Sequence, residues 1–132
     1  MIIFGYIEHI LYAEYVAWMI SVPLNFTPLQ KIIYFAVVPF GAMLPDIDMV
    51  DSKLGHKIKP LSGWLNKTVG HRTLTHSLFF TTVLYYSANI AFGMNIFTTG
   101  LMVGAAMHIL FDTMTPAGVP LAYPLSTKIF RL

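Results

Sequence analysis

Four apolar segments of about membrane-spanning length make up most of this chain. They cover roughly residues 2–22, 28–44, 73–92 and 96–114 of the 132-residue sequence, and a helical span needs about 20 mostly apolar residues. Only 11% of the residues are charged, against roughly 25% in an average soluble domain, so a globular surface would be poorly covered. We therefore expect one domain, residues 1–132: an all-α, polytopic membrane bundle of about four transmembrane helices.

Composition also excludes several functional classes. The chain has no cysteine, which removes disulfide frameworks and thiolate metal sites and leaves His, Asp and Glu as metal ligands. A net charge of only +2 together with 56% hydrophobic residues disfavours both disorder and nucleic-acid binding. We expect membrane lipid as a partner and no nucleic acid.

Residues 46–72 form the one long polar loop, and they hold five of the eight Lys and Arg residues. A short interfacial helix is expected near 61–65, with Trp64 at headgroup depth. With four spans, this loop and the C-terminal tail lie on the same side of the membrane, and together they carry seven of the eight basic residues. The positive-inside rule then predicts a multi-pass inner (cytoplasmic) membrane protein with both termini in the cytoplasm.

On that topology, seven histidine and aspartate side chains fall near one membrane face although they span more than 100 residues of sequence. They are His9, Asp46, Asp48, His71, His76, His108 and Asp112. Burying such groups between helices is costly unless they are paired or bind an ion. Imidazoles and carboxylates without thiolates suit zinc, manganese or iron, and suit magnesium less. The pattern predicts a site for a divalent metal, zinc first, with one or two ions.

The spacing within the last helix supports this site. His108 and Asp112 are four residues apart and share a helical face, and Gly100 and Gly104 precede them on the same row. Small residues at this spacing let another helix approach closely. The Gly100–Gly104 pair suits a homo-oligomer as well as an internal contact, and the row from Gly5 through His9 repeats the pattern in the first helix.

Seven candidates exceed the three or four protein ligands of one catalytic zinc. Either two metal ions are held, or some of the seven orient the ligands. Metal-bound water becomes a nucleophile near neutral pH, and a non-ligand carboxylate can take its proton. Asp48 and Arg72 are the candidate catalytic residues, with Arg72 either stabilising a phosphoryl charge or extending to the interface. The expected reaction is hydrolysis of an ester or phosphoester.

Three ordered motifs also resemble the YdjM-like family of predicted membrane-bound, metal-dependent hydrolases. They are Leu44–Asp48 (LPDID), Gly70–Ser77 (GHRTLTHS) and His108–Pro120 (HILFDTMTPAGVP). That family is distantly similar to zinc-dependent phospholipase C and the single-strand nucleases. The resemblance implies phosphoester chemistry and the same seven ligands. One departure is that Met49 and Val50 follow Asp48, where the family usually has His-Pro.

Two other functional classes fit the same residues. The main alternative is a non-catalytic helical membrane protein with a structural metal site, which would be closed, whereas a catalytic site keeps an open coordination position. A carrier of metal ions or protons would place polar residues through the depth of the bilayer. The candidate residues instead gather on one side, which counts against a carrier.

Overall fold

The computed structural model describes residues 2–70 and 73–132, and over these residues the chain is all-α, as predicted. Six α-helices and two short 3-10 helices follow one another in these two ranges, and the described residues contain no β-strand beyond a single bridge between Val119 and Phe130. The elements are α1 (Ile2–Ser21), η1 (Val22–Leu24), α2 (Pro28–Met43), η2 (Pro45–Asp48), α3 (Lys53–Lys57), α4 (Lys59–Val69), α5 (Leu78–Phe92) and α6 (Ile96–Thr113).

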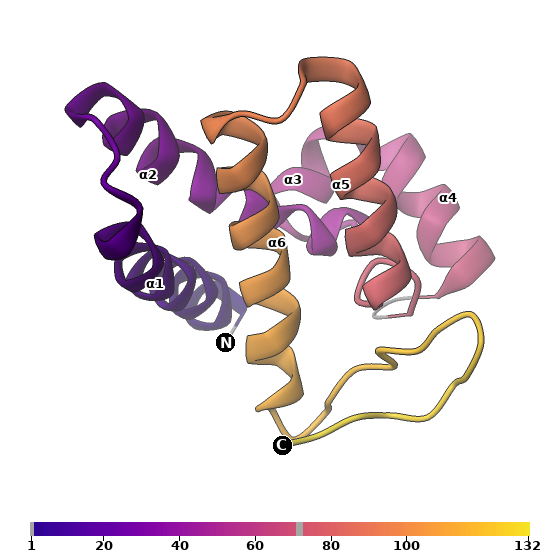
Figure 1. Ribbon diagram of the computed structural model, residues 1–132. Coiled ribbons are helices and arrows are strands. Elements are labelled where there is room, and N and C mark those ends of the chain that lie inside the picture. Colours follow the sequence, from indigo (N-terminus) through magenta and orange to yellow (C-terminus); the bar gives the residue numbers. More distant parts are fainter. Residues whose placement is uncertain (1, 71–72) are drawn as a thin grey trace.

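Helix α6 is the centre of the arrangement (Figure 1). Helices α1 and α2 pack on one side of it and on each other, and α5 packs against α6 on the other side. Helices α3 and α4 lie in the fainter background, α3 between α6 and α5 and α4 to the right of α5, and the yellow C-terminal tail forms a loop that extends to the right from the lower end of α6.

Local sequence signals set the helix ends. Thr27 caps α2, because its hydroxyl accepts a hydrogen bond from the Gln30 backbone N–H at 3.3 Å, and the Gln30 side chain accepts one from the Thr27 N–H at 2.9 Å. Pro28 occupies the first helical turn, where its missing N–H costs nothing. The predicted bounds of this helix, roughly residues 28–44, are confirmed.

The prediction that the third apolar helix begins at residue 73 is wrong. Helix α5 begins at Leu78, because the Ser77 hydroxyl caps it by accepting from the Phe80 N–H at 3.2 Å. Residues 73–77 form turns instead. Helix α5 is therefore 15 residues long, which is shorter than a perpendicular bilayer span.

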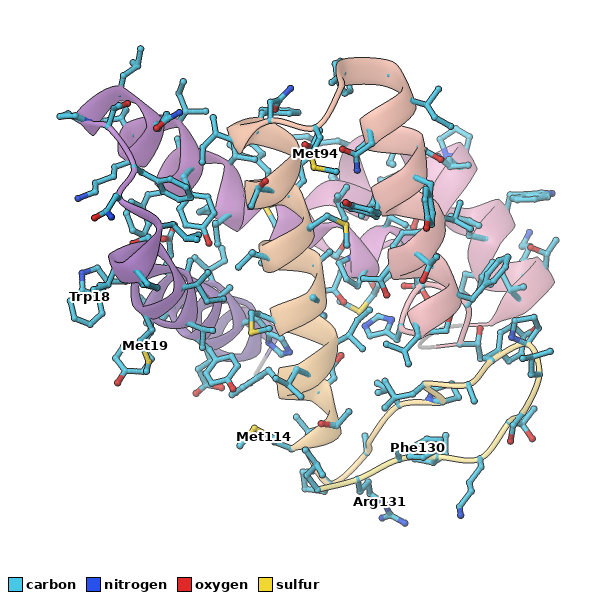
Figure 2. The ribbon with its side chains drawn as sticks, in the orientation of Figure 1. Trp18, Met19, Met94, Met114, Phe130 and Arg131 are labelled. Atoms are coloured by element: carbon cyan, nitrogen blue, oxygen red, sulfur yellow. The ribbon has the colours of Figure 1, made fainter. Side chains whose placement is uncertain are left out.

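Within residues 2–70 and 73–132, two helical segments have the length and hydropathy of a membrane span, namely Pro28–Asp48 and Ile96–Thr113. Helix α5 is apolar but shorter, and α1 has 20 residues. Large apolar side chains project outward from several helices; Leu11, Phe40 and Ile90 are 63%, 66% and 87% exposed. Trp18 and Met19 likewise extend away from the ribbon (Figure 2). Such extensive apolar exposure is typical of a surface that meets another apolar phase.

Small residues let α2 and α6 pack with their backbones in contact. A Cβ atom at Gly104 would lie 2.2 Å from the Val38 carbonyl oxygen, and one at Gly41 would lie 2.3 Å from the Leu101 carbonyl oxygen. The Gly100–Gly104 row therefore packs on α2 of the same chain. The sequence suited this glycine pair either to an oligomer contact or to a contact within the chain. This structure contains the contact within the chain.

The polar loop is more helical than the sequence predicts. Instead of one short helix it holds α3 and α4, and Ser52 caps α3 by accepting from the Gly55 N–H at 2.9 Å. The expected interfacial segment 61–65 lies within α4, where Leu61 and Trp64 are both exposed.

Candidate metal centre

Five of the seven predicted site residues come together in one cluster. The N-terminal half of α1, the end of α2 with η2, the turn before α5 and the last turns of α6 each contribute to it. Among the described residues, two overlapping groups could hold a metal ion: His9 with His108 and Asp112, and Asp46 with His76 and His108. His71 and Arg72 lie outside the described residues.

The histidine nitrogens and the carboxylate oxygens of the cluster lie close together. His76 Nε2 lies 3.1 Å from Asp112 Oδ2 and 3.7 Å from Asp46 Oδ1. His108 Nε2 lies 3.4 Å and 3.6 Å from the same two oxygens. Tetrahedral ligands at zinc bond lengths are about 3.3 Å apart, and these four histidine–carboxylate separations are close to that value.

The ring nitrogens on the far side of the histidines have fixed partners. His108 Nδ1 donates to the Ala42 carbonyl oxygen at 2.6 Å, and His9 Nδ1 donates to the Gly5 carbonyl oxygen. His76 Nδ1 lies 3.1 Å from the Thr75 hydroxyl oxygen. Hydrogen bonds of this kind hold metal-binding imidazoles in one tautomer and orientation. All three rings thereby direct the Nε2 lone pair toward the carboxylates.

Asp48 lies behind His76, and neither group of described residues that could hold a metal includes it. Its Oδ2 accepts the Thr75 hydroxyl at 2.9 Å, so the Thr75 oxygen is left to accept from His76 Nδ1. The Asn66 side chain donates to the Asp48 carbonyl oxygen at 3.2 Å, which ties α4 to the centre. The catalytic roles assigned to Asp48 and Arg72 from the sequence stay predictions.

Thr75 is the functional residue that the sequence reasoning missed. It is 1% exposed and links a carboxylate to an imidazole. Its position immediately before a candidate ligand histidine was the available signal, since hydroxyl and carboxylate groups commonly orient ligand imidazoles.

The centre is buried on most sides. The side chains of His76 and Asp112 are fully buried, whereas the Asp46 side chain is 20% exposed and provides the more accessible edge. Burial lowers the pKa of His76, which favours the neutral imidazole that a metal requires. His108 Nε2 has no hydrogen-bond partner among the described residues although two carboxylate oxygens lie nearby. Three imidazoles and two carboxylates in this arrangement fit a divalent cation.

Thr75→Val tests whether the Thr75 hydroxyl holds the His76 ring in place for metal binding. The substitution keeps the side-chain shape but removes the hydroxyl that joins Asp48 to the imidazole, so we expect zinc affinity to fall about 10- to 100-fold. Competition with a chelator measures it. Thr82→Val on the exposed face of α5 is the matched control; equal effects of the two substitutions would contradict the assigned role of Thr75.

Fold and centre together define a class: an all-α protein with an apolar surface and a buried histidine–aspartate cluster that could hold a metal ion. The chain belongs to the YdjM inner membrane protein family, whose model matches residues 5–132. Family membership makes it an inner membrane protein.

Similarity to individual proteins agrees with the family. The chain is 39% identical over 95 residues to the inner membrane protein YdjM of Escherichia coli, covering 68% of this chain and 48% of that protein. It is 35% identical over 89 residues to the uncharacterized protein YvsG of Bacillus subtilis, covering 67% and 56%. The chain therefore spans about half the length of these curated relatives. No solved structure matches it.

Proposed function

We propose that the chain crosses the inner membrane four times, with both termini in the cytoplasm and the metal centre at the cytoplasmic end. The geometry of the centre supports this topology, because it joins the first half of α1, the end of α2, the turn before α5 and the end of α6. A chain that alternates direction through a membrane brings these four places to the same side. Seven of the eight basic residues are on that side as well.

We propose further that the protein is a metal-dependent hydrolase, with zinc as the first candidate metal, that acts on a phosphoester or phospholipid at the cytoplasmic leaflet. The convergence of three Nε2 atoms on two carboxylates carries this proposal. A divalent ion bound there would polarise a phosphoryl oxygen and supply a nucleophile by lowering the pKa of water. The location of the centre in a membrane protein favours a lipid substrate, whose headgroup lies at this depth.

The surrounding residues take separate roles in this proposal. His76, His108 and Asp112 are the buried ligands. Asp46 faces both imidazoles at the more accessible edge, with longer separations of 3.6 and 3.7 Å, so it is suited to accept the proton of the attacking water. His9 Nε2 lies 3.1 Å from Asp112 Oδ1. His76 and His108 lie closest to the other carboxylate oxygen, Oδ2. His9 therefore either orients that carboxylate or helps to hold a second ion.

Asp46→Asn separates turnover from metal binding. The amide keeps the shape and an oxygen donor but cannot accept a proton, so we expect zinc to remain bound while hydrolysis falls by roughly 100-fold or more. Zinc content and release of water-soluble phosphate from phospholipid vesicles are the measurements. Asp51→Asn, an exposed carboxylate in the same loop, is the control. Full activity of Asp46→Asn would overturn the role of Asp46.

The burial of the ligands favours one second candidate, a structural metal site. His108 is 2% exposed and His76 and Asp112 are fully buried, and closed sites are typical of structural zinc. This candidate predicts that zinc raises the melting temperature of the wild-type protein without any cleavage of phospholipids or simple phosphodiesters. Zinc-dependent cleavage, lost on chelation, would exclude it.

A further inference from the structure

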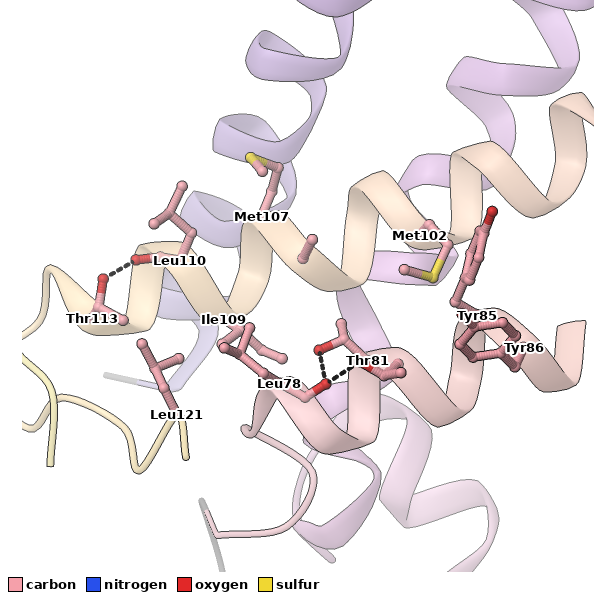
Figure 3. A pocket seen from close by; sticks show the side chains of 12 residues that line it. Leu78, Thr81, Tyr85, Tyr86, Met102, Met107, Ile109, Leu110, Thr113 and Leu121 are labelled. Atoms are coloured by element: carbon pink, nitrogen blue, oxygen red, sulfur yellow. Dashed lines mark hydrogen bonds between the residues drawn. The ribbon is translucent and has the colours of Figure 1, made fainter. Parts of the chain in front are cut away.

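A groove of about 590 Å³ runs between α5 and α6, on the side of α6 that faces away from α2 (Figure 3). Leu78, Ile109, Thr113 and Leu121 line one end of it. Tyr85, Tyr86 and Met102 line the other end.

The threonine hydroxyls of the groove wall are hydrogen-bonded to backbone carbonyl groups. The Thr81 hydroxyl donates to the Ser77 carbonyl oxygen at 3.0 Å, the Thr82 hydroxyl to the Leu78 carbonyl at 2.8 Å, and the Thr113 hydroxyl to the Leu110 carbonyl at 2.6 Å. Because each hydroxyl is bonded to its own helix, it offers no free donor to a ligand, and the threonines present mainly methyl groups. The wall therefore selects an apolar occupant over a polar one.

The dimensions of the groove correspond to one leaflet of a bilayer. Its lining on α6 runs from Met102 to Thr113, which at 1.5 Å per residue is about 16 Å. Half of a hydrocarbon core about 30 Å thick is about 15 Å. A lipid acyl chain that starts at headgroup depth would fill this length.

One end of the groove lies at the same level along α6 as the metal ligands. Thr113 follows Asp112 directly, Ile109 follows His108, and Leu78 lies two residues after His76. An acyl chain in the groove would thus have its ester end at the level of the metal ligands and its methyl end toward the middle of the membrane.

We propose that the α5–α6 groove binds an acyl chain of the phospholipid on which the metal centre acts. This assignment rests on the proposed hydrolase function for the identity of the lipid as substrate, but the binding itself is measurable without turnover. A phosphoester without a long apolar chain would gain no binding free energy from the groove wall. The groove would therefore favour phospholipids over such phosphoesters as substrates.

Depth-graded photocrosslinking tests the proposal. The full chain is reconstituted in vesicles of phosphatidylethanolamine and phosphatidylglycerol that contain phosphatidylethanolamine with a diazirine near either the ester or the methyl end of one acyl chain. We expect the ester-end label to react near Leu78, Leu110 and Thr113, and the methyl-end label near Tyr85 and Met102. Equal labelling of the exposed residues of α1 and α2 by both probes would overturn the proposal, because that is the pattern of unspecific surrounding lipid.

A filling variant provides the matched comparison. Ala106→Trp places a large ring inside the groove, and because the ring occupies the space of the acyl chain, we expect the depth-graded groove crosslinks to be lost. Ala91→Trp, at an exposed position of α5 that does not line the groove, should leave them unchanged. If Ala106→Trp changes the oligomeric state and leaves lipid labelling intact, the groove binds a second copy of the chain and the proposal is wrong. The positions of the ester-end and methyl-end crosslinks in the wild-type protein test the groove even if Ala106→Trp does not fold.

The two proposals fail in different ways. Asp46→Asn should keep the depth-graded crosslinks, since it changes no groove residue. Crosslinks without any phospholipid cleavage by the zinc-loaded wild type would contradict the hydrolase but keep the groove. Cleavage with uniform crosslinks would contradict the groove but keep the hydrolase.

Discussion

Asp112→Asn is expected to lower zinc affinity by more than about 100-fold, beyond the range produced by changing outer partners of a metal site. Asp112 is fully buried, and its two oxygens lie 3.1 Å from His9 Nε2, 3.1 Å from His76 Nε2 and 3.4 Å from His108 Nε2. It is thus the anion that all three imidazoles share. The Asn side chain carries no negative charge. It would present to the ion either its NH2 group or its amide oxygen, which is a weaker metal ligand than a carboxylate oxygen.

The measurement is zinc stoichiometry by elemental analysis together with chelator competition on the purified protein. Asp51→Asn makes the same chemical change at an exposed carboxylate and should leave both values unchanged. A melting temperature recorded without zinc shows whether the Asp112 variant still folds. If the folded variant keeps wild-type zinc affinity, Asp112 is not a ligand.

Gly104→Ala is expected to destabilise the bundle by about 3 kcal/mol, the upper end of the range for overpacking. The added Cβ would lie 2.2 Å from the Val38 carbonyl oxygen and 2.6 Å from the Ala42 nitrogen, so a rigid backbone rather than a flexible side chain has to move. Ala42 also holds the His108 ring through its carbonyl oxygen. Separation of α2 from α6 should therefore weaken zinc binding as well as folding.

Gly63→Ala is the matched control, because a Cβ there meets no atom within 4 Å in helix α4. It should be neutral or stabilise the helix by about 0.5–1 kcal/mol. Thermal unfolding in detergent measures both variants, and Gly104→Ala should melt roughly 10 °C lower than wild type. Equal melting temperatures would show that the close contact between α2 and α6 is absent.

The sequence was sufficient to predict which side chains come together in the site, but not the contacts that orient them. Charge bias and apolar length placed Asp46, His76, His108 and Asp112 near one end of their helices, and that end is where the structure brings them together. The i, i+4 spacing of His108 and Asp112 and the glycines before them already indicated which face of α6 packs inward.

The contacts between distant parts of the chain could not be predicted from the sequence. The carbonyl groups of Gly5 and Ala42 that fix two imidazoles carry no sequence signature, because every residue has a carbonyl. The start of α5 was misplaced because residues 73–77 are compatible with a helix until Ser77 is recognised as its cap. The α5–α6 groove depends on how two helices diverge, which periodicity does not encode.

A crystal structure of the zinc-loaded protein, with anomalous scattering recorded at the zinc edge, shows directly whether zinc binds in this cluster. We expect a peak within about 2.0–2.2 Å of His76 Nε2, His108 Nε2 and an Asp112 carboxylate oxygen. A zinc-saturated protein with no peak among these side chains, or with its zinc bound at another place, would show that the histidine–aspartate cluster is not a zinc site.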